Sequence, residues 1–322
     1  MISCNSGSDA LLISLLLNKK NNKNIYLTTP MSYIASASIP KFLNLELIYI
    51  DVEKDNYLMC LNKLEKFLKT CPISLKKRIN GIINVELFGQ TCDLVKLNKI
   101  SKKYKLSLIG DCAQSFGSKY NNKSTINYYD YATTSFYPTK ILSCYGDGGA
   151  VFFKEKYHNV LLLKNNGHDL KNKSDCLKIG INSRLDSIQA MVLFEEITKL
   201  NKIIKKKSKI FKFYNKYLKD NLNIKLINNF NKKIKSNNYI YPVLVNKNYR
   251  KKLMNYMLKN SIEPKIFYSK LLSSNNVLKP ILKTDLKNSI KCSKELICIP
   301  SNESLQNKDI NKIVYTLNKL KL

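Results

Sequence analysis

The sequence predicts an α/β protein with a large domain, built on a mostly parallel, doubly wound sheet with helices on both faces, and a smaller C-terminal α+β domain. Between residues 25 and 153, short apolar segments alternate with amphipathic helical ones, as in crossover units on a parallel sheet. After Arg184 the pattern changes to a long helical stretch, a single strand and two more helices. The chain has 322 residues, of which 44% are hydrophobic, so it is long enough to bury two cores.

Each strand is predicted from a short apolar run, and each helix from apolar residues that recur every three or four positions. The predicted strands of the sheet are 25–28, 47–50, 81–85, 106–109, 132–136 and 150–153, and a separate strand is 239–245. The predicted helices are 61–69, 94–104, 185–219, 249–260 and 309–320. The Asn- and Lys-rich segment 228–238 is predicted to be a surface loop. We expect the large domain to span residues 1–200 and the small domain residues 201–322.

The formal net charge of +32 raises the question of a nucleic-acid partner. The excess is almost all lysine and runs through the whole chain, whereas base recognition uses arginine and aromatic side chains gathered in one patch. A bias in composition explains the charge better, and a positive field would favour anionic substrates. We expect no nucleic-acid partner, although a polyanion-binding basic protein stays an alternative.

The lengths of the apolar runs and the spacing of the cysteines indicate in which cellular compartment the protein is found. No run of about 18 apolar residues is present, and the apolar run 10–17 lacks a basic segment before it, so we expect neither a membrane span nor a signal peptide. The nine cysteines are scattered without a C-x-x-C pair, and the chain has only two histidines. This pattern favours reduced thiols and no metal site, and therefore a cytoplasmic protein.

The run Gly7-Ser8-Asp9 precedes the first apolar helical segment. The first N–H groups of a helix and the positive end of its dipole can bind an anion such as phosphate. The alternative is that Ser8 or Asp9 merely caps the helix.

Two further segments place reactive side chains where predicted strands end. Asp111 and Gln114 follow the strand 106–109, and ligands bind at the carboxyl ends of strands in sheets of this kind. Lys140 follows the strand 132–136 and precedes a glycine-rich turn. Burial there would lower the pKa of its amine and make it nucleophilic toward an aldehyde. A turn-forming aspartate and a surface lysine are the alternatives.

These segments, in this order, resemble the sugar aminotransferases of the DegT/DnrJ/StrS type over nearly the whole chain. The motifs that carry the resemblance are G-S-D-A at 7–10, T-P-M-S-Y-I-A-S at 29–36, D-C-A-Q at 111–114, S-F-Y-P-T-K at 135–140 and G-I-N-S-R-L at 180–185. The family is a branch of the fold-type I enzymes that use pyridoxal 5'-phosphate (PLP). The resemblance thus implies an aminotransferase fold of type I, with PLP bound by the large domain.

The resemblance also implies a role for each matching residue. Lys140 would form the Schiff base with PLP and then shuttle protons, while Asp111 would pair with the pyridine nitrogen and keep it protonated. Gln114 would lie beside the ring and Tyr33 would stack on it. The implied phosphate contacts are Gly7, Ser8, Asp9, Ser135 and, from the neighbouring subunit, Asn182.

The implied reaction moves an amino group, with glutamate as donor, onto a keto sugar carried by a nucleotide, in the biosynthesis of cell-surface polysaccharide or glycoconjugate. An obligate homodimer with shared active sites is implied as well. A sugar dehydratase of the same fold has histidine in place of the lysine, so Lys140 argues against that activity. A catalytically silent or truncated relative stays an alternative.

The sequence departs from the family pattern in two ways. Several dozen residues, including a helix at the dimer interface and the substrate mouth, normally precede the G-S-D-A motif, which here begins at Gly7. A misplaced start, a truncated copy and a dispensable helix would each explain this difference. In addition, Gly110 stands where an acid is common, Cys112 where alanine is usual and Glu86 where histidine is frequent. We expect these three to affect sugar preference, and none of them removes a PLP anchor.

Overall fold

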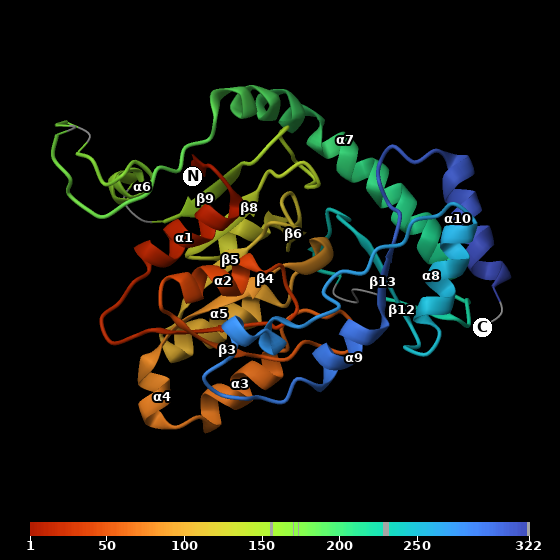
Figure 1. Ribbon diagram of the computed structural model, residues 1–322, viewed down its shortest axis with the longest axis horizontal. Helices are drawn as coiled ribbons and strands as arrows, with labels where there is room; N and C mark the ends of the chain where they lie inside the picture. Colours follow the sequence, from red (N-terminus) through yellow and green to blue (C-terminus); the bar gives the residue numbers. More distant parts are fainter. Residues whose placement is uncertain (155–156, 170, 173, 228–231, 321–322) are drawn as a thin grey trace.

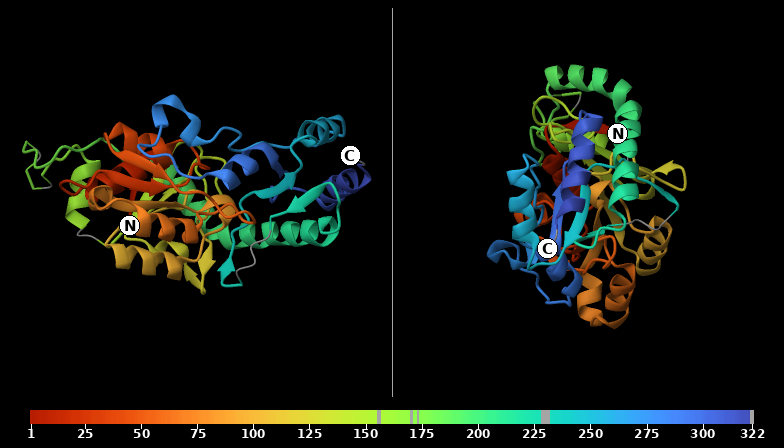
Figure 2. Two further views of the ribbon diagram at one scale, coloured as in Figure 1. Left: turned by 90° about the horizontal axis from the view of Figure 1, so that it is seen from below. Right: turned by 90° about the vertical axis from the view of Figure 1, so that its right-hand side faces the viewer.

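The computed structural model describes residues 1–154, 157–169, 171–172, 174–227 and 232–320. A large sheet with its helices and a smaller sheet with its own helices are joined by one long helix, α7 (Ser187–Leu218) (Figure 1). The turned views show α7 running alongside both parts (Figure 2). No helix within the described ranges is long and apolar enough to cross a membrane.

The large sheet is mostly parallel. Its seven strands follow the order β1 (Ile2–Cys4), β9 (Gly149–Phe153), β8 (Tyr131–Ser135), β5 (Ser107–Asp111), β4 (Ile79–Val85), β2 (Ile25–Thr28) and β3 (Glu46–Tyr49). From β3 to β8 all neighbours pair parallel, while β9 and β1 are antiparallel additions at one edge. The predicted α/β fold with a mostly parallel sheet is confirmed, and all six strands predicted for this sheet exist within a few residues of their predicted bounds.

Helices cover both faces of this sheet, because successive side chains along each strand point to opposite sides. In β2, Ile25 and Leu27 pack with the helices on one face, and Tyr26 packs with those on the other. The first face carries α3 (Leu61–Thr70) and α5 (Leu94–Tyr104), and the second carries α1 (Gly7–Leu17) and α2 (Ala35–Phe42). Shorter helices of this part are α4 (Ile73–Arg78), α6 (Tyr157–Lys164), η1 (Leu87–Gly89) and η2 (Thr125–Tyr128).

The smaller sheet is antiparallel and has its own core. Its strands are β10 (Ile224–Leu226), β12 (Tyr241–Val245) and β13 (Leu296–Ile299), and its helices are α8 (Arg250–Lys259) and α10 (Asn307–Lys319). Tyr214 of α7, Leu253 and Leu317 are buried together in this core. The second half of α7 therefore belongs to the smaller core, while its first half packs on the large sheet. The domain limits at residues 200 and 201 stay a prediction, since α7 is continuous there.

The prediction of a surface loop over 228–238 is wrong in its second half. Ile234–Lys235 forms β11, which pairs with β6 (Lys119–Tyr120), and β6 pairs in turn with β7 (Lys123–Ser124). Asn237 is fully buried, and its amide donates to the carbonyl oxygens of residues 114 and 116. Composition alone misses such an element because its partners lie more than a hundred residues away. Residues 228–231 lie outside the described part of the chain.

The segment between α8 and β13 returns to the large sheet. It contains η3 (Leu272–Ser274), η4 (Asn276–Leu278) and α9 (Lys287–Glu295). Leu272 and Leu278 pack into the core formed by α1 and α2. The C-terminal part of the chain is thus attached to the large sheet at this segment as well as through α7.

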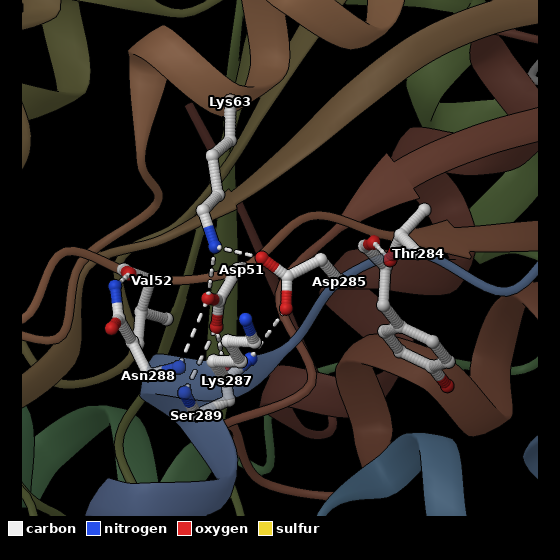
Figure 3. A network of polar contacts seen from close by, with 9 residues as sticks. Asp51, Val52, Lys63, Thr284, Asp285, Lys287, Asn288 and Ser289 are labelled. Carbon is white, nitrogen blue, oxygen red and sulfur yellow. Dashed lines mark hydrogen bonds and ion pairs between the residues drawn. The ribbon is translucent and has the colours of Figure 1, made fainter.

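A buried carboxylate, that of Asp51, holds the start of α9 (Figure 3). Asp51 lies just after β3, its side chain is 0% exposed, and it accepts from Lys63 Nζ at 2.6 Å. The same carboxylate accepts from the backbone N–H groups of Asn288 and Ser289 at 3.1 and 2.9 Å. Lys63 also bonds to the exposed Asp285 at 2.9 Å. Asp51 therefore caps a helix that is more than two hundred residues away in the sequence.

We expect Asp51→Asn to lower the free energy of unfolding at neutral pH by about 2 kcal/mol, since it removes a buried carboxylate that pairs with the partly exposed Lys63 and accepts several charge-assisted hydrogen bonds. Asp285→Asn, which removes an exposed partner of the same lysine, should cost less than about 1 kcal/mol. Urea unfolding of both variants measures the difference. Equal losses from the two variants would contradict this role of Asp51.

The stability that Asp51 contributes should depend on pH. Burial would raise the pKa of Asp51, but the bonds from Lys63, Ser289 and Asn288 outweigh it and hold that pKa below its ordinary value of 3.8. The stabilisation is therefore complete above pH 3.8 and is lost as the pH falls through the lower, folded-state pKa. The difference in stability between the parent and Asp51→Asn should accordingly shrink below about pH 4.

Candidate active site

Asp111 and Lys140 meet at the carboxyl ends of two adjacent strands. Asp111 is the last residue of β5, and Lys140 lies in the turn after β8, which pairs with β5. The Asp111 carboxyl group is buried, and its Oδ1 accepts from the N–H of Ala113 at 3.3 Å. The two side chains interact electrostatically, so the pair that the sequence predicted is brought together.

Burial perturbs both groups in the direction of their neutral forms. It raises the pKa of Asp111, against the N–H of Ala113 and the charge of Lys140. It lowers the pKa of Lys140, against the charge of Asp111. An amine with a lowered pKa is deprotonated more readily and can attack a carbonyl carbon, and perturbed pairs of this kind are typical of catalytic sites.

Gln114 links this pair to a segment of the C-terminal part. Its Oε1 accepts from the N–H of Phe88 at 2.8 Å, and its Nε2 donates to the hydroxyl of Tyr268 at 2.5 Å. Phe88 and Tyr268 both have a positive φ, near 60°, a conformation that is uncommon for aromatic residues. Gln114 is therefore held in place from two sides.

Tyr239 and Tyr268 belong to the site although no motif pointed to them. Lys140 Nζ lies 5.4 Å from the centre of the Tyr239 ring, and the Tyr268 hydroxyl interacts electrostatically with both Asp111 and Tyr239. Burial raises the pKa of both phenols. No motif marked either residue: Tyr239 was only the first residue of the predicted strand 239–245, and Tyr268 lies between predicted elements. Both reach the site only through the fold.

The start of α1 lies directly against the end of β8. A Cβ atom on Gly7 would lie 2.7 Å from Ser135 Cβ, and one on Gly149 would lie 2.3 Å from the carbonyl oxygen of Ser6. Only glycine fits at either position. Helix geometry leaves the N–H groups of Gly7 and Ser8 without an intrahelical acceptor, and Ser135 Oγ is next to them. Together they form a cradle of donors that suits a phosphate group.

Asp9 has structural partners in this cradle. Its N–H donates to Ser6 Oγ at 3.1 Å, which makes Ser6 the N-cap, and its carboxylate accepts from Ser183 Oγ at 2.7 Å. Asp9 thereby fixes the segment that carries Asn182 beside α1. Its predicted phosphate contact stays a prediction.

Tyr33 and Asn182 lie at the surface of the single chain. Tyr33, in the turn before α2, is 63% exposed. Asn182 is exposed, and its Oδ1 accepts from Arg184 Nε at 3.0 Å. Within the described part of the chain neither side chain hydrogen-bonds to the residues around Lys140. Their predicted contacts with the ring and with a neighbouring subunit's phosphate stay predictions.

The residues present fit PLP. Among the described residues no cation forms an ion pair with the buried Asp111 carboxyl group, which interacts with Lys140 only through its charge. A protonated pyridine nitrogen would stabilise the charged form of this carboxyl group. The donor cradle at Gly7, Ser8 and Ser135 suits the phosphate. A parallel sheet with a lysine, an acid and a phosphate cradle at the carboxyl ends of its strands defines an enzyme of the PLP-dependent class.

The sequence pattern of the DegT/DnrJ/EryC1/StrS aminotransferase family matches residues 1–318. The chain therefore belongs to this family of PLP-dependent sugar aminotransferases, and the resemblance found in its motifs is confirmed.

Relatives of known activity and structure agree with this membership. The UDP-2-acetamido-2-deoxy-3-oxo-D-glucuronate aminotransferase of Pseudomonas aeruginosa is 32% identical over 218 residues, which are 68% of this chain and 59% of that protein. The dTDP-4-amino-4,6-dideoxy-D-glucose transaminase of Shigella dysenteriae is 24% identical over 98% of this chain and 84% of its own length. The crystal structure of a DegT DnrJ EryC1 StrS aminotransferase from Brucella abortus superposes with a TM-score of 0.91, at 28% identity, covering 98% of this chain and 84% of the other.

Proposed function

We propose that the protein transfers an amino group from glutamate to a keto sugar carried by a nucleotide, with PLP held at Lys140. The observation that carries the proposal is the pair of the buried Asp111 and the half-buried Lys140, both shifted in pKa by burial, beside a phosphate cradle. The substrate class is supported by the names of two relatives, the enzymes of Pseudomonas aeruginosa and Shigella dysenteriae, which refer to a UDP-linked and a dTDP-linked sugar.

Each residue of the site has a part in this proposal. PLP, when bound, supplies an electron sink for the electrons released when a proton leaves the substrate carbon. Lys140 would bind the cofactor's aldehyde through Nζ and then use the same atom to move that proton. Asp111 would hold the proton on the pyridine nitrogen, and Gln114, fixed from two sides, would keep the ring in place. The N–H groups of Gly7 and Ser8 and the hydroxyl of Ser135 would bind the phosphate.

We also propose a homodimer, and the surface of α7 supports it. Its first half presents an apolar stripe, between 51% and 72% exposed, made of Ile188, Met191, Phe194 and Ile197. Exposed stripes of this kind are typical of protein interfaces. The N–H of the exposed Tyr145, in the turn that follows Lys140, donates to Gln189 Oε1 of the same helix. A partner bound to this α7 stripe would thus lie next to the active site, where its Asn182 could reach the phosphate.

Phe194→Lys should convert a dimer into a monomer, because it buries a charge in the proposed interface. Light scattering of the parent, of this variant and of the control Lys202→Ala, an exposed change off the stripe, gives the mass of each. We also expect the monomer to bind PLP more weakly, since it would lose the partner's Asn182. A parent that is monomeric at micromolar concentration would refute the dimer.

The proposed reaction is tested by incubating purified protein with PLP, glutamate and a panel of UDP- and dTDP-linked 3- and 4-keto sugars. We expect a visible absorption band of bound PLP and the formation of an amino sugar together with 2-oxoglutarate. A colourless protein after addition of PLP would favour a catalytically silent relative. All nine cysteines, which lie among the described residues, are unpaired, and this supports a cytosolic enzyme of polysaccharide or glycoconjugate biosynthesis.

A further inference from the structure

A fully buried carboxyl group, that of Glu86, lies beside the turn 111–115 and is not used by the proposed reaction. Glu86 follows β4, its side chain is 0% exposed, and it forms no ion pair among the described residues. The hydroxyl of Tyr129 donates to its Oε1 at 2.7 Å, and Ser115 Oγ donates to its Oε2. The hydroxyls of Thr91 and Thr125 also interact with this carboxyl group.

The environment of Glu86 is built by other departures from the family pattern. A Cβ on Gly110 would lie 2.5 Å from the Tyr129 ring, so only glycine leaves room for that ring. Asn84 Nδ2 donates to the Tyr129 hydroxyl at 2.7 Å, and therefore the phenolic proton is directed to Glu86. Gly110, Cys112 and Glu86 are all buried in this network. Their effect on sugar preference stays a prediction.

Three hydrogen bonds connect the segment after β4 with the turn 111–115. The N–H of Glu86 donates to the carbonyl oxygen of Asp111 at 3.0 Å. The Glu86 carboxyl group accepts from Ser115 at the far end of the turn. The N–H of Phe88 donates to the Gln114 side chain at 2.8 Å. The segment 86–88 thus contacts the turn at both ends and at the side chain of Gln114.

We propose that Glu86 is a positioning residue that fixes the turn 111–115, through Ser115, in the geometry that Asp111 and Gln114 need to hold the PLP ring. The inference rests on the proposed PLP site. Glu86 acts through hydrogen bonds, so a neutral side chain of the same shape should replace it. Burial raises the pKa of Glu86, against the four hydroxyl groups, which agrees with a role that does not require a negative charge.

The test measures the Kd of PLP, from the visible band, and the melting temperature without PLP for three variants. Glu86→Gln should keep the Kd within about threefold, because its amide can accept from Tyr129 and donate to Ser115. Ser115→Ala, which removes the bond at the turn, should raise the Kd about tenfold, with a loss of melting temperature no larger than that of Glu86→Ala. Glu86→Ala should raise the Kd by at least as much and shift the absorption maximum.

Asp51→Ala is the matched control, since it removes a buried, hydrogen-bonded carboxylate that lies outside the site. It should lower the melting temperature and leave the Kd of PLP unchanged. If Ser115→Ala and Glu86→Ala bind PLP like the parent, the positioning role is refuted. If Glu86→Ala fails to fold, Ser115→Ala alone decides. A parent that does not bind PLP would instead overturn the proposed function, and this inference with it.

Discussion

Lys140→Ala should lower the rate of transamination by at least about 10³-fold, because the side chain is proposed both to bind PLP and to move the substrate proton. The visible band of the cofactor should disappear. The protein should still fold, since Lys140 has no hydrogen-bonded partner among the described side chains and its burial already disfavours its charge. Single-turnover assays with glutamate and PLP, together with a melting curve, measure both effects.

Two controls isolate the amine at this position. Lys140→Arg retains a positive charge but cannot form a Schiff base, so it should be as inactive as the alanine variant. Lys99→Ala removes an exposed lysine of α5 and should leave the rate unchanged. A near-normal rate in either Lys140 variant would overturn the assignment.

Asp111→Asn should lower kcat/KM by about 10²-fold or more, because an amide does not stabilise a protonated pyridine nitrogen as a carboxylate does. Removing the charge of Asp111 should also lower the pKa of Lys140 further, since that charge is what opposes the effect of burial. Kinetics at saturating PLP separate this loss from weaker cofactor binding. Asp147→Asn, in the exposed part of the glycine-rich turn, is the control and should be neutral.

The same substitution should stabilise the protein when no PLP is bound. Burial raises the folded-state pKa of Asp111 above its ordinary value of 3.8, so its contribution to stability falls as the pH rises above that value. At neutral pH the parent therefore carries an unfavourable buried acid that Asn removes. A higher melting temperature for cofactor-free Asp111→Asn is expected, and a lower one would show that Asp111 contributes to folding.

The spacing of apolar residues was enough to predict most helices and strands of the large sheet. The amphipathic helix over 94–104 coincides with α5, and the buried strands of the parallel sheet were found because each is a short apolar run. Asp111 and Lys140 could be placed at strand ends before the fold was known, since the chain order of strands and motifs puts them at one edge.

Features made by distant partners could not be predicted in this way. β11 exists because β6 offers it an edge, and Asn237 is buried because its amide bonds to carbonyl groups more than a hundred positions earlier. Tyr268 enters the site through a turn with a positive φ that no motif marks. The network of Glu86 depends on the space that Gly110 leaves for the Tyr129 ring, a contact between residues that no local pattern marks.

The two attachments of the smaller sheet limit how it can move. The helix α7 has 32 residues, about 48 Å measured along its axis, and it contributes side chains to both cores. The hydrogen bonds between Asp51 and the start of α9 form the second attachment. Because the smaller sheet is attached to the large sheet at two separate points, it cannot open about a single hinge. Small shear displacements are the domain movement that this architecture allows.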